Sequence, residues 1–466
     1  MHRRHVLRAR TLATLLLLGL GLGCMPSSRV RDAGSALLPV RQGAGPWLLQ
    51  VKHVDEWDPP LVQKPGERFT QAPPGTVFRR RTDLWVRTPS GDSGYALTAT
   101  GRVLVEPVNE WGVNGVAISP DGRRVAYVET TQSTGARTGP WHVLWVVNAD
   151  GTDRRLLVDL DLLFPGGLPR TGALLWSSDG RHLAYVLYSR PAGASSSDDL
   201  QATVHAVEVD TGQRSALFQV PRPGLLQPLA WSTARGEFTF SLHTKTSADP
   251  GARLDTLTVY RLGTSTARAT PAQGFASPDG QHLFLASRPE YRMHEPPEWL
   301  WDGATLDVPP DVVPFIPRHV AWRHEQPVAY VSTYLGATWM HEMSEDGFGL
   351  CGAMCFTSNE TPPAMLYRAE GVSTRPRLER LPGHERQLVL GFSPDDAHVL
   401  VAVSSLRPRV DTEGCLSNAF DVLLVAERSA FEASTSLDSL LSASIRIDEP
   451  PSQTRQIPWG VIGWVR

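Results

Sequence analysis

The sequence predicts an all-β protein built from a four-stranded unit that repeats along the chain. Two alternating phrases carry this prediction. The first is ISPDGRRVAYV at 118–128, which returns as WSSDGRHLAYV at 176–186, ASPDGQHLFLA at 276–286 and FSPDDAHVLVA at 392–402. The second, as in LWVVNADGTDRRLLV at 144–158, is a strand, a turn with glycine and another strand. Each phrase supplies two strands, and a pair of phrases therefore supplies four.

The first phrase contains a tight hairpin turn. In Ser-Pro-Asp-Gly, proline presets the backbone of the second turn position, aspartate suits the third, and glycine accepts the left-handed conformation that closes the hairpin. A structural turn role is therefore assigned to Asp121, Gly122, Asp179, Gly180, Asp279, Gly280 and Asp395. In the last copy Asp396 replaces the glycine, which an aspartate tolerates at modest strain.

The spacing of the first phrase predicts the architecture. The run after each turn, such as RRVAYV, is almost continuously apolar, as in a strand that is covered on both faces. Weaker copies begin at Trp231 and Trp322, and the six starts at 118, 176, 231, 276, 322 and 392 are 45 to 70 residues apart. A period near 45 with insertions is typical of four-stranded β-propeller blades.

The second phrase and the chain ends complete the predicted blades. Further outer hairpins lie at 204–218, 257–270, 300–308 and 365–381. Residues 82–98 read as an outer hairpin without an inner strand, and residues 459–466 as an inner strand without outer partners. We expect them to share a closing blade, with an added strand from Trp47 to Trp57. This velcro closure removes open sheet edges and favours seven blades, with six or eight as alternatives.

The repeat also resembles a known family. WSSDGRHLAYV, together with hairpins of the LWVVNADGTDRRLLV type, resembles the TolB-type, WD40-like β-propeller repeat, and it is similar to the propeller half of prolyl-oligopeptidase-like peptidases. The resemblance covers roughly residues 83 to 466. It implies that the strand entering each SPDG turn lies nearest the central channel. It also implies a binding or scaffold protein of the bacterial cell envelope.

The N-terminus predicts export and a lipid anchor. Four arginines precede the apolar run TLATLLLLGLGLG, which is too short to span a bilayer comfortably. The segment ends in LGLGC, which resembles the lipobox of bacterial lipoproteins, and this implies lipid modification of Cys24. An ordinary signal peptide followed by a chance cysteine is the alternative.

These features give a domain plan and a location. Residues 1–23 are predicted to be a lipoprotein-type signal peptide, residues 24–45 a flexible tether, and residues 46–466 a single β-propeller domain. Acyl chains on Cys24 would anchor the protein to a membrane. We therefore expect a monomer in the cell envelope, at the outer membrane or the periplasmic face, with an envelope protein or polymer as its partner.

The charge balance argues against nucleic acid as a partner. The chain has 45 Lys and Arg against 48 Asp and Glu, and residues 1–23 contain four arginines and no acid. The mature chain is therefore acidic, whereas nucleic-acid binding is driven by clustered positive charge.

The motif search favours a non-catalytic protein. The sequence contains no G-x-S-x-G elbow, H-E-x-x-H, P-loop or paired C-x-x-C, and no stretch outside the repeats is long enough for an α/β-hydrolase domain. NADGTD at 148–153 lacks the full ligand series of a calcium loop and is better explained as a hairpin turn. We expect no catalytic residues, no metal and no cofactor. An exported propeller hydrolase or lyase, with its active site at the channel mouth, is the alternative.

Three cysteines besides Cys24 predict a disulfide, because the chain is expected to be exported. Cys351, Cys355 and Cys415 all fall in connections between the second and third strands of neighbouring blades. We expect a bridge from Cys415 to Cys351 or Cys355, with a bridge between Cys351 and Cys355 as the alternative.

Loop length is the strongest functional asymmetry of the sequence. The connections between second and third strands are long and, in a propeller, emerge on one face. The longest, at 332–363, carries Tyr334, Trp339, Met340, Met343 and Phe348 among few charges. Loops beyond about 12 residues are often functional, and aromatic and Met side chains favour binding surfaces. We predict that this loop binds a partner, with a structural plug over the channel mouth as the alternative.

Overall fold

The fold is that of a computed structural model. The residues that it describes are 47–58, 77–107, 113–131, 141–160, 173–189, 201–220, 224–245, 253–264, 266–270, 272–287, 298–306, 317–333, 365–371, 376–384, 387–403, 409–410, 416–417, 422–447 and 461–466. All of them belong to one compact unit, Leu37–Arg466.

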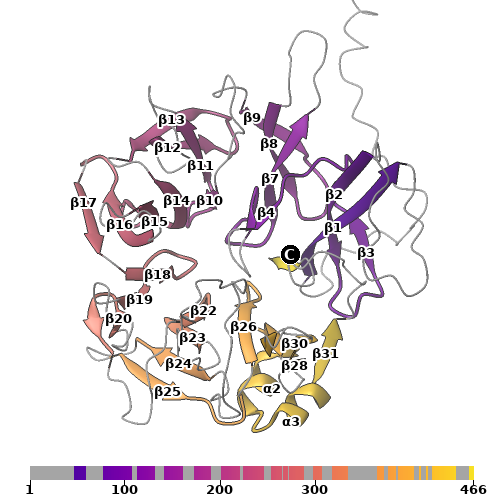
Figure 1. The fold of residues 1–466 in the computed structure, drawn as a ribbon, viewed down its shortest axis with the longest axis vertical. Coiled ribbons are helices and arrows are strands. Elements are labelled where there is room, and N and C mark those ends of the chain that lie inside the picture. The colour runs from indigo at the N-terminus through magenta and orange to yellow at the C-terminus, as the bar shows by residue number, and fades with distance from the viewer. Residues whose placement is uncertain are drawn as a thin grey trace, which may run out of the picture. The chain divides into compact units, whose positions relative to one another are not determined.

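The described chain forms seven four-stranded antiparallel sheets, which are the blades of a β-propeller (Figure 1). Six blades follow one another along the chain and are numbered in that order. Blades 1 to 3 comprise β6 (Val116–Ile118), β7 (Arg124–Thr131), β8 (Trp141–Asn148) and β9 (Arg155–Asp159); β10 (Leu174–Trp176), β11 (His182–Ser189), β12 (Gln201–Glu208) and β13 (Arg214–Gln219); and β14 (Leu225–Ser232), β15 (Glu237–Lys245), β16 (Arg253–Arg261) and β17 (Thr266–Thr270). Blades 4 to 6 comprise β18 (Ala272–Ala276), β19 (Leu283–Ser287), β20 (Glu298–Trp301) and β21 (Ala304–Thr305); β22 (Pro317–Trp322), β23 (Val328–Thr333), β24 (Leu366–Glu370) and β25 (Arg377–Arg380); and β26 (Gln387–Phe392), β27 (His398–Val403), β30 (Val422–Glu427) and β31 (Ser444–Ile447).

The seventh blade joins the two ends of the described chain. Its strands, in sheet order, are β32 (Val461–Val465), β1 (Trp47–Asp58), β2 (Val77–Arg87) and β3 (Gly94–Ala96). The C-terminal strand pairs antiparallel with the first strand, Trp47 lying beside Val465. The predicted all-β fold, the count of seven blades and the velcro closure are therefore confirmed, and this sheet is the closing blade.

The hydrophobic core lies between the blades. In β11, Leu183 and Tyr185 pack with residues of blade 1, whereas Ala184 and Val186 pack with residues of blade 3. Successive side chains of a strand point to opposite faces of the sheet, and each face of a blade meets a neighbouring blade. This arrangement explains why the strand after each turn is almost continuously apolar.

The propeller has two faces that differ in their connections. The N–H of Arg466, after β32, donates to Gly122 O at 2.7 Å, in the turn between β6 and β7. The end of β32 therefore lies on the face that carries the turns between first and second strands, which we name the turn face. Because β1 runs antiparallel to β32, the connection between β1 and β2 lies on the opposite face, the loop face. By the same alternation, all connections between second and third strands begin and end on the loop face.

Two small hairpins and two helices lie outside the blade sheets. β4 (Glu106–Pro107) pairs with β5 (Val113–Asn114), and β28 (Arg409–Val410) pairs with β29 (Leu416–Ser417). The helices α2 (Arg428–Ala433) and α3 (Leu437–Ser442) connect β30 to β31. Phe431 of α2 and Leu440 of α3 are buried and pack against the core between blades 5 and 6. In the part of the chain that the structure describes, no helix is long and apolar enough to cross a membrane.

Candidate functional site

Four of the turns between first and second strands each contain the same pattern of hydrogen bonds. In blade 1, the Ser119 hydroxyl donates to Asp121 Oδ1 at 2.6 Å, and the same oxygen accepts the Arg123 N–H at 3.1 Å. The Ser119 hydroxyl oxygen accepts the Arg124 N–H at 2.9 Å. The same contacts recur around Ser177 and Asp179, Ser277 and Asp279, and Ser393 and Asp395. The serine is not among the residues predicted from the sequence, although it recurs in all four phrases.

Glycine closes three of these four turns. Gly122, Gly180 and Gly280 have φ angles of 72°, 67° and 66°, in the left-handed region that glycine adopts without steric cost. The structure thus places all seven of the predicted turn residues within the turns. It distributes them around the ring, one turn to a blade, and does not bring them together in one site.

Hydrogen bonding lowers the pKa of two turn carboxylates, Asp179 and Asp395. Burial raises the pKa of Asp179, but hydrogen bonds from the Ser177 hydroxyl and the Arg181 N–H outweigh burial and leave the pKa below its usual value. The pKa of Asp395 is also lowered, because hydrogen bonds from Ser393 and the Ala397 N–H outweigh burial. Both carboxylates act as acceptors within their own turns, and their role there is conformational.

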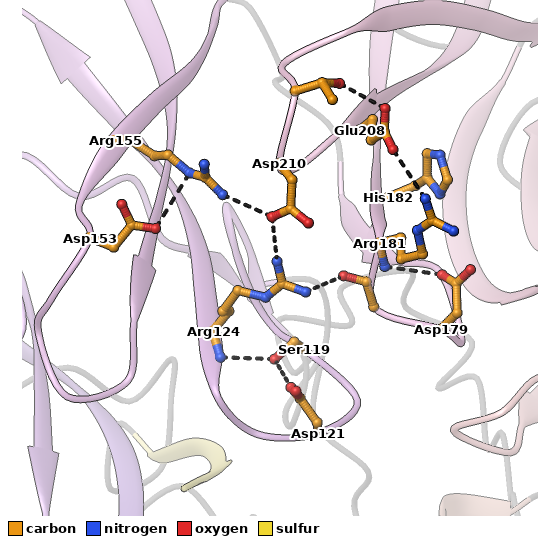
Figure 2. Close-up of polar contacts among 12 residues, drawn as sticks. Ser119, Asp121, Arg124, Asp153, Arg155, Asp179, Arg181, His182, Glu208 and Asp210 are labelled. Carbon is orange, nitrogen blue, oxygen red and sulfur yellow. Dashed lines mark hydrogen bonds and ion pairs between the residues drawn. The ribbon is translucent and has the colours of Figure 1, made fainter.

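The turn face carries a charged cluster at the seam between blades 1 and 2 (Figure 2). Arg124, at the start of β7, donates to Gly180 O at 2.6 Å in the turn of blade 2 and pairs with Asp210 Oδ1 at 3.3 Å. Arg155, at the start of β9, pairs with the same carboxylate oxygen at 3.2 Å. The Asp210 side chain is 70% exposed. The cluster therefore joins two blades through charges that pair with one another at the surface.

A second contact at this seam repeats around the ring. The guanidinium carbon of Arg124 lies 5.2 Å from the centre of the Trp176 ring, within the range of a cation–π interaction. In three other blades the equivalent position, six residues after the phrase start, is a histidine. The rings of His182, His282 and His398 lie 5.6, 6.4 and 6.2 Å from those of Trp231, Trp322 and Trp464, each in the following blade.

The exceptions follow the same pairing. Glu237 and Val328 occupy this position in blades 3 and 5, and the following blades then carry Ala276 and Phe392 in place of tryptophan. Arginine or histidine therefore occurs where the next blade offers a tryptophan. The pairing is visible in the sequence once the phrases are aligned, and it is a signal for contacts between blades that the turn motif alone does not give.

The seam between the closing blade and blade 1 holds a partly buried ion pair, in which the side chains of Glu129 and Arg154 are 6% and 29% exposed. Arg154 Nη2 donates to the two carboxylate oxygens of Glu129 at 3.0 and 2.9 Å, and Arg154 Nε donates to the Tyr127 hydroxyl at 2.6 Å. The Thr100 hydroxyl, from the segment after β3, donates to Glu129 at 2.7 Å. Burial raises the pKa of Tyr127 to about 12, against the lowering effect of Arg154. The tyrosine therefore remains a neutral hydrogen-bonding group at physiological pH.

The inner strands contain few ionisable groups. Among inner-strand side chains that the structure describes, His319 alone is titratable, and its Nε2 lies 3.2 Å from Leu390 O in blade 6. No three or more His, Cys, Asp and Glu side chains of the described ranges are grouped so as to hold a metal ion.

Several predicted residues lie outside the described residues. They are the lipidation site Cys24, the disulfide candidates Cys351, Cys355 and Cys415, and the partner-binding candidates Tyr334, Trp339, Met340, Met343 and Phe348.

Comparison with known proteins concerns the fold. No protein-family model and no curated protein sequence matches the chain. Among solved structures, oligogalacturonate lyase from Vibrio parahaemolyticus is 13% identical, with a TM-score of 0.42 over 74% of this chain and 83% of that chain. The β-propeller domain of the Trilobed protease from Pyrococcus furiosus is 13% identical, with a TM-score of 0.42 over 75% and 90% of the two chains. Pyrococcus horikoshii acylaminoacyl peptidase is 12% identical, with a TM-score of 0.44 over 74% and 46%.

These similarities correct the prediction of a non-catalytic protein. That prediction rests on the absence of a hydrolase domain and of catalytic motifs from the sequence. It is wrong, because the similar propellers include a lyase and peptidases. The lyase match covers most of that enzyme's chain. At these identities the likeness shows the fold and assigns no activity to this chain. No family model supports the TolB-type or lipoprotein assignment.

Proposed function

We propose that this chain is a TolB-like propeller of the bacterial cell envelope that binds a protein or polymer partner on its loop face. Export by residues 1–23 and acylation of Cys24 would hold the folded unit at a membrane surface, on the tether 24–45. In this proposal the protein acts as a monomer at the outer membrane or the periplasmic face.

A projecting ribbon on the loop face is the observation that carries the proposal. Within the described residues, β1 pairs with β32 only from Trp47 to Gln50, while β1 and β2 remain paired out to Asp58 and Val77. The outer part of this hairpin therefore extends beyond the four-stranded sheet on the loop face. Val51 and Thr82 at the base of this hairpin are buried, and Thr82 also pairs with Arg102. The projecting part of the ribbon therefore runs from Val54 to Asp58 and is roughly 17 Å long at about 3.4 Å per residue.

The two small hairpins outside the blade sheets also belong to the loop face, whereas α2 and α3, between the third and fourth strands of blade 6, belong to the turn face. The β28–β29 hairpin interrupts the connection between β27 and β30, and β4–β5 precedes the loop-face end of β6. On the turn face, the connections between first and second strands in blades 1 to 6 have only four to six residues. Variable segments on a rigid scaffold are where proteins usually place recognition. The loop face is therefore better suited to selecting a partner.

The base of the ribbon has side chains that suit a protein interface. Lys52 Nζ lies 4.2 Å from the centre of the Trp85 ring, and Val54, two residues further along the same face of β1, is 44% exposed. Aromatic rings are enriched in protein interfaces, where they combine with apolar side chains. The base of the ribbon thus offers an exposed apolar side chain and a partly exposed aromatic ring within a segment of mixed charge.

A pull-down with matched variants tests the proposal. The mature domain, without Cys24, serves as bait for solubilised envelope of the source bacterium. We expect Val54→Asp on the ribbon to reduce partner recovery. Leu156→Asp should leave it unchanged, because Leu156 is 50% exposed on β9, the outer strand of blade 1. Equal recovery by the two variants, both folded, would contradict the assignment of binding to the ribbon.

The same purified domain tests the enzyme alternative. Oligogalacturonate and acylaminoacyl peptides are the probe substrates, because oligogalacturonate lyase and acylaminoacyl peptidase are among the similar propellers. Turnover that disappears on heat denaturation would establish a catalytic propeller, and the bound polymer or peptide would then be its substrate.

A further inference from the structure

Two neighbouring turns depart from the repeat in complementary ways. In blade 5 the turn between β22 and β23 is Arg-His-Glu-Gln-Pro at 323–327, without the serine, the aspartate or the glycine. Arg323 stands where the other five phrases have a serine, and it is buried. In blade 6 the turn is Ser-Pro-Asp-Asp, with Asp396 in the place of the glycine. The turn of blade 5 thus lacks the aspartate of the repeat, although it carries Glu325, and the turn of blade 6 has one carboxylate more than its own hydrogen bonds use.

The extra carboxylate of blade 6 lies in the turn of blade 5. Asp396 Oδ1 accepts the His324 N–H at 2.8 Å, and Asp396 Oδ2 accepts the Glu325 N–H at 3.0 Å. Oδ2 also lies 3.5 Å from Nε of Arg323. The Asp396 side chain is 2% exposed, and these contacts place its charge among three N–H groups of blade 5.

Asp396 has a second role that Asp395 does not share. Asp395 accepts the Ser393 hydroxyl and the Ala397 N–H, as the turn aspartates of the other blades do within their own turns. Asp396 instead holds a left-handed backbone with a φ of 54°, a conformation that glycine adopts more readily. Its contacts with blade 5 are therefore retained in spite of an unfavourable backbone position.

A chain of polar contacts continues from Asp396 back into blade 5. Arg428 Nε, at the start of α2, donates to Asp396 O at 2.8 Å, and Arg428 Nη1 donates to Glu432 Oε2 at 3.1 Å. The Tyr330 hydroxyl of β23 donates to Glu432 Oε1 at 2.6 Å. Burial and the Glu432 carboxylate both raise the pKa of Tyr330, so the hydroxyl remains a donor. The two blades are thus joined at the turn and again at the middle of β23.

We propose that Asp396 is a positioning residue that completes the turn of blade 5 from blade 6. The loss of Ser and Asp in one turn and the replacement of Gly in the next are a single compensated pair. Blades 5 and 6 consequently behave as one cooperative unit. This unit includes β23, the strand that leads into the long connection to β24, residues 334–365.

Asp396→Gly tests the proposal, because relief of the local backbone strain and loss of the contacts with blade 5 change the free energy of unfolding in opposite directions. If only the local backbone mattered, glycine at φ 54° would stabilise the protein or leave it unchanged. We expect destabilisation instead, with the His324 and Glu325 amides exchanging hydrogen at least about tenfold faster, because each loses a bond to a charged acceptor. A neutral or stabilising Asp396→Gly with unchanged exchange at these two amides would overturn the proposal.

Three further variants separate positioning from a general loss of stability. Ser393→Ala weakens the turn of blade 6 from within and should leave the exchange of the His324 and Glu325 amides close to that of the parent. Arg323→Ser with Asp396→Gly restores the repeat residues at both positions and should recover stability relative to Asp396→Gly alone. If Asp396→Gly does not fold, Asp396→Asn replaces it as the test. The asparagine side chain keeps only one acceptor oxygen, so one of the two N–H groups, of His324 or Glu325, should lose its protection from exchange. Additive losses in the double variant, or an Asn variant that matches the parent, would refute the compensated pair.

Discussion

The seam between blades 1 and 2 and the seam between blades 5 and 6 join equivalent turns by different chemistry. At the first seam, Arg124 reaches forward to Gly180 O and to Asp210, whose side chain is 70% exposed. At the second seam, Asp396 reaches back to N–H groups of the preceding turn, and its side chain is 2% exposed. One seam is held by a partly buried cation, 21% exposed, that pairs with an exposed carboxylate, and the other by a buried anion.

This difference indicates where the ring depends on single residues. Exposed ion pairs contribute little to stability, because water and salt compete with them. A buried charged group that accepts several hydrogen bonds matters more, since removal of one partner leaves the other buried and uncompensated. We therefore expect the seam between blades 5 and 6 to be sensitive to substitution and the seam between blades 1 and 2 to be tolerant.

The largest effect is expected for Glu432→Ala at the buried seam. The substitution removes the acceptor of the buried Tyr330 hydroxyl and a partner of Arg428. We expect the free energy of unfolding to fall by about 2–3 kcal/mol, the usual loss for hydrogen bonds to a charged group. Chemical denaturation, monitored by tryptophan fluorescence, measures this free energy. Glu427→Ala, at an exposed position next to α2, is the control and should change little; equal losses would show that the seam is not the cause.

A smaller effect is expected for Arg124→Ala at the surface seam. The variant loses the hydrogen bond to Gly180 O and the contact with Trp176. Together these contribute about 1–2 kcal/mol. Arg124→Lys should recover only part of the loss, because lysine keeps the charge but not the forked donors. Full recovery by lysine would mean that charge alone holds this seam.

Acid should weaken the turns of both seams together. The folded-state pKa values of Asp179 and Asp395 are lowered, so the unfolded chain binds more protons at these sites. Their contribution to stability is therefore complete above the unfolded-state pKa of about 4 and is lost as the pH falls through the folded-state values. Thermal unfolding measured from neutral pH down to about pH 3 should show a steeper decline for the parent than for Asp179→Asn. Parallel curves would contradict the role of this carboxylate.

The smallest effect is expected for Asp210→Ala. This exposed carboxylate pairs with Arg124 and Arg155 at the surface. Its removal should cost less than about 1 kcal/mol at low salt, and the difference should vanish at about 1 M salt because the charges are screened. A loss as large as that of Glu432→Ala would remove the distinction between the two seams.

Most of the fold could be predicted because each blade repeats the same short sequence patterns. The SPDG turns, the apolar runs after them and the outer hairpins each depend on residues close in sequence, and the structure contains them at the expected places. Even the closing blade could be inferred, because residues 459–466 lack outer strands and residues 82–98 lack an inner one. The helices α2 and α3 are a difference from the predicted all-β repeat, and they occupy the connection between the third and fourth strands of blade 6.

The contacts between blades could not be predicted in the same way. Asp396 meets His324 and Glu325 across 72 and 71 residues of sequence, and the turn motif alone explains it only as a tolerated replacement of glycine. Its role depends on how one turn faces the next, which local propensity does not encode. The partner-binding residues and the disulfide remain predictions, because they lie outside the described residues.

Site-specific photocrosslinking tests the central claim, that recognition lies on the loop face, most directly. One photoreactive residue replaces Val54 on the ribbon, and another replaces Arg181, whose side chain is 67% exposed on the turn face. Both variants are expressed as the full-length chain in the organism of origin. We predict a reproducible crosslink to an envelope component from position 54 and none from position 181. Crosslinks from position 181 alone would contradict the account.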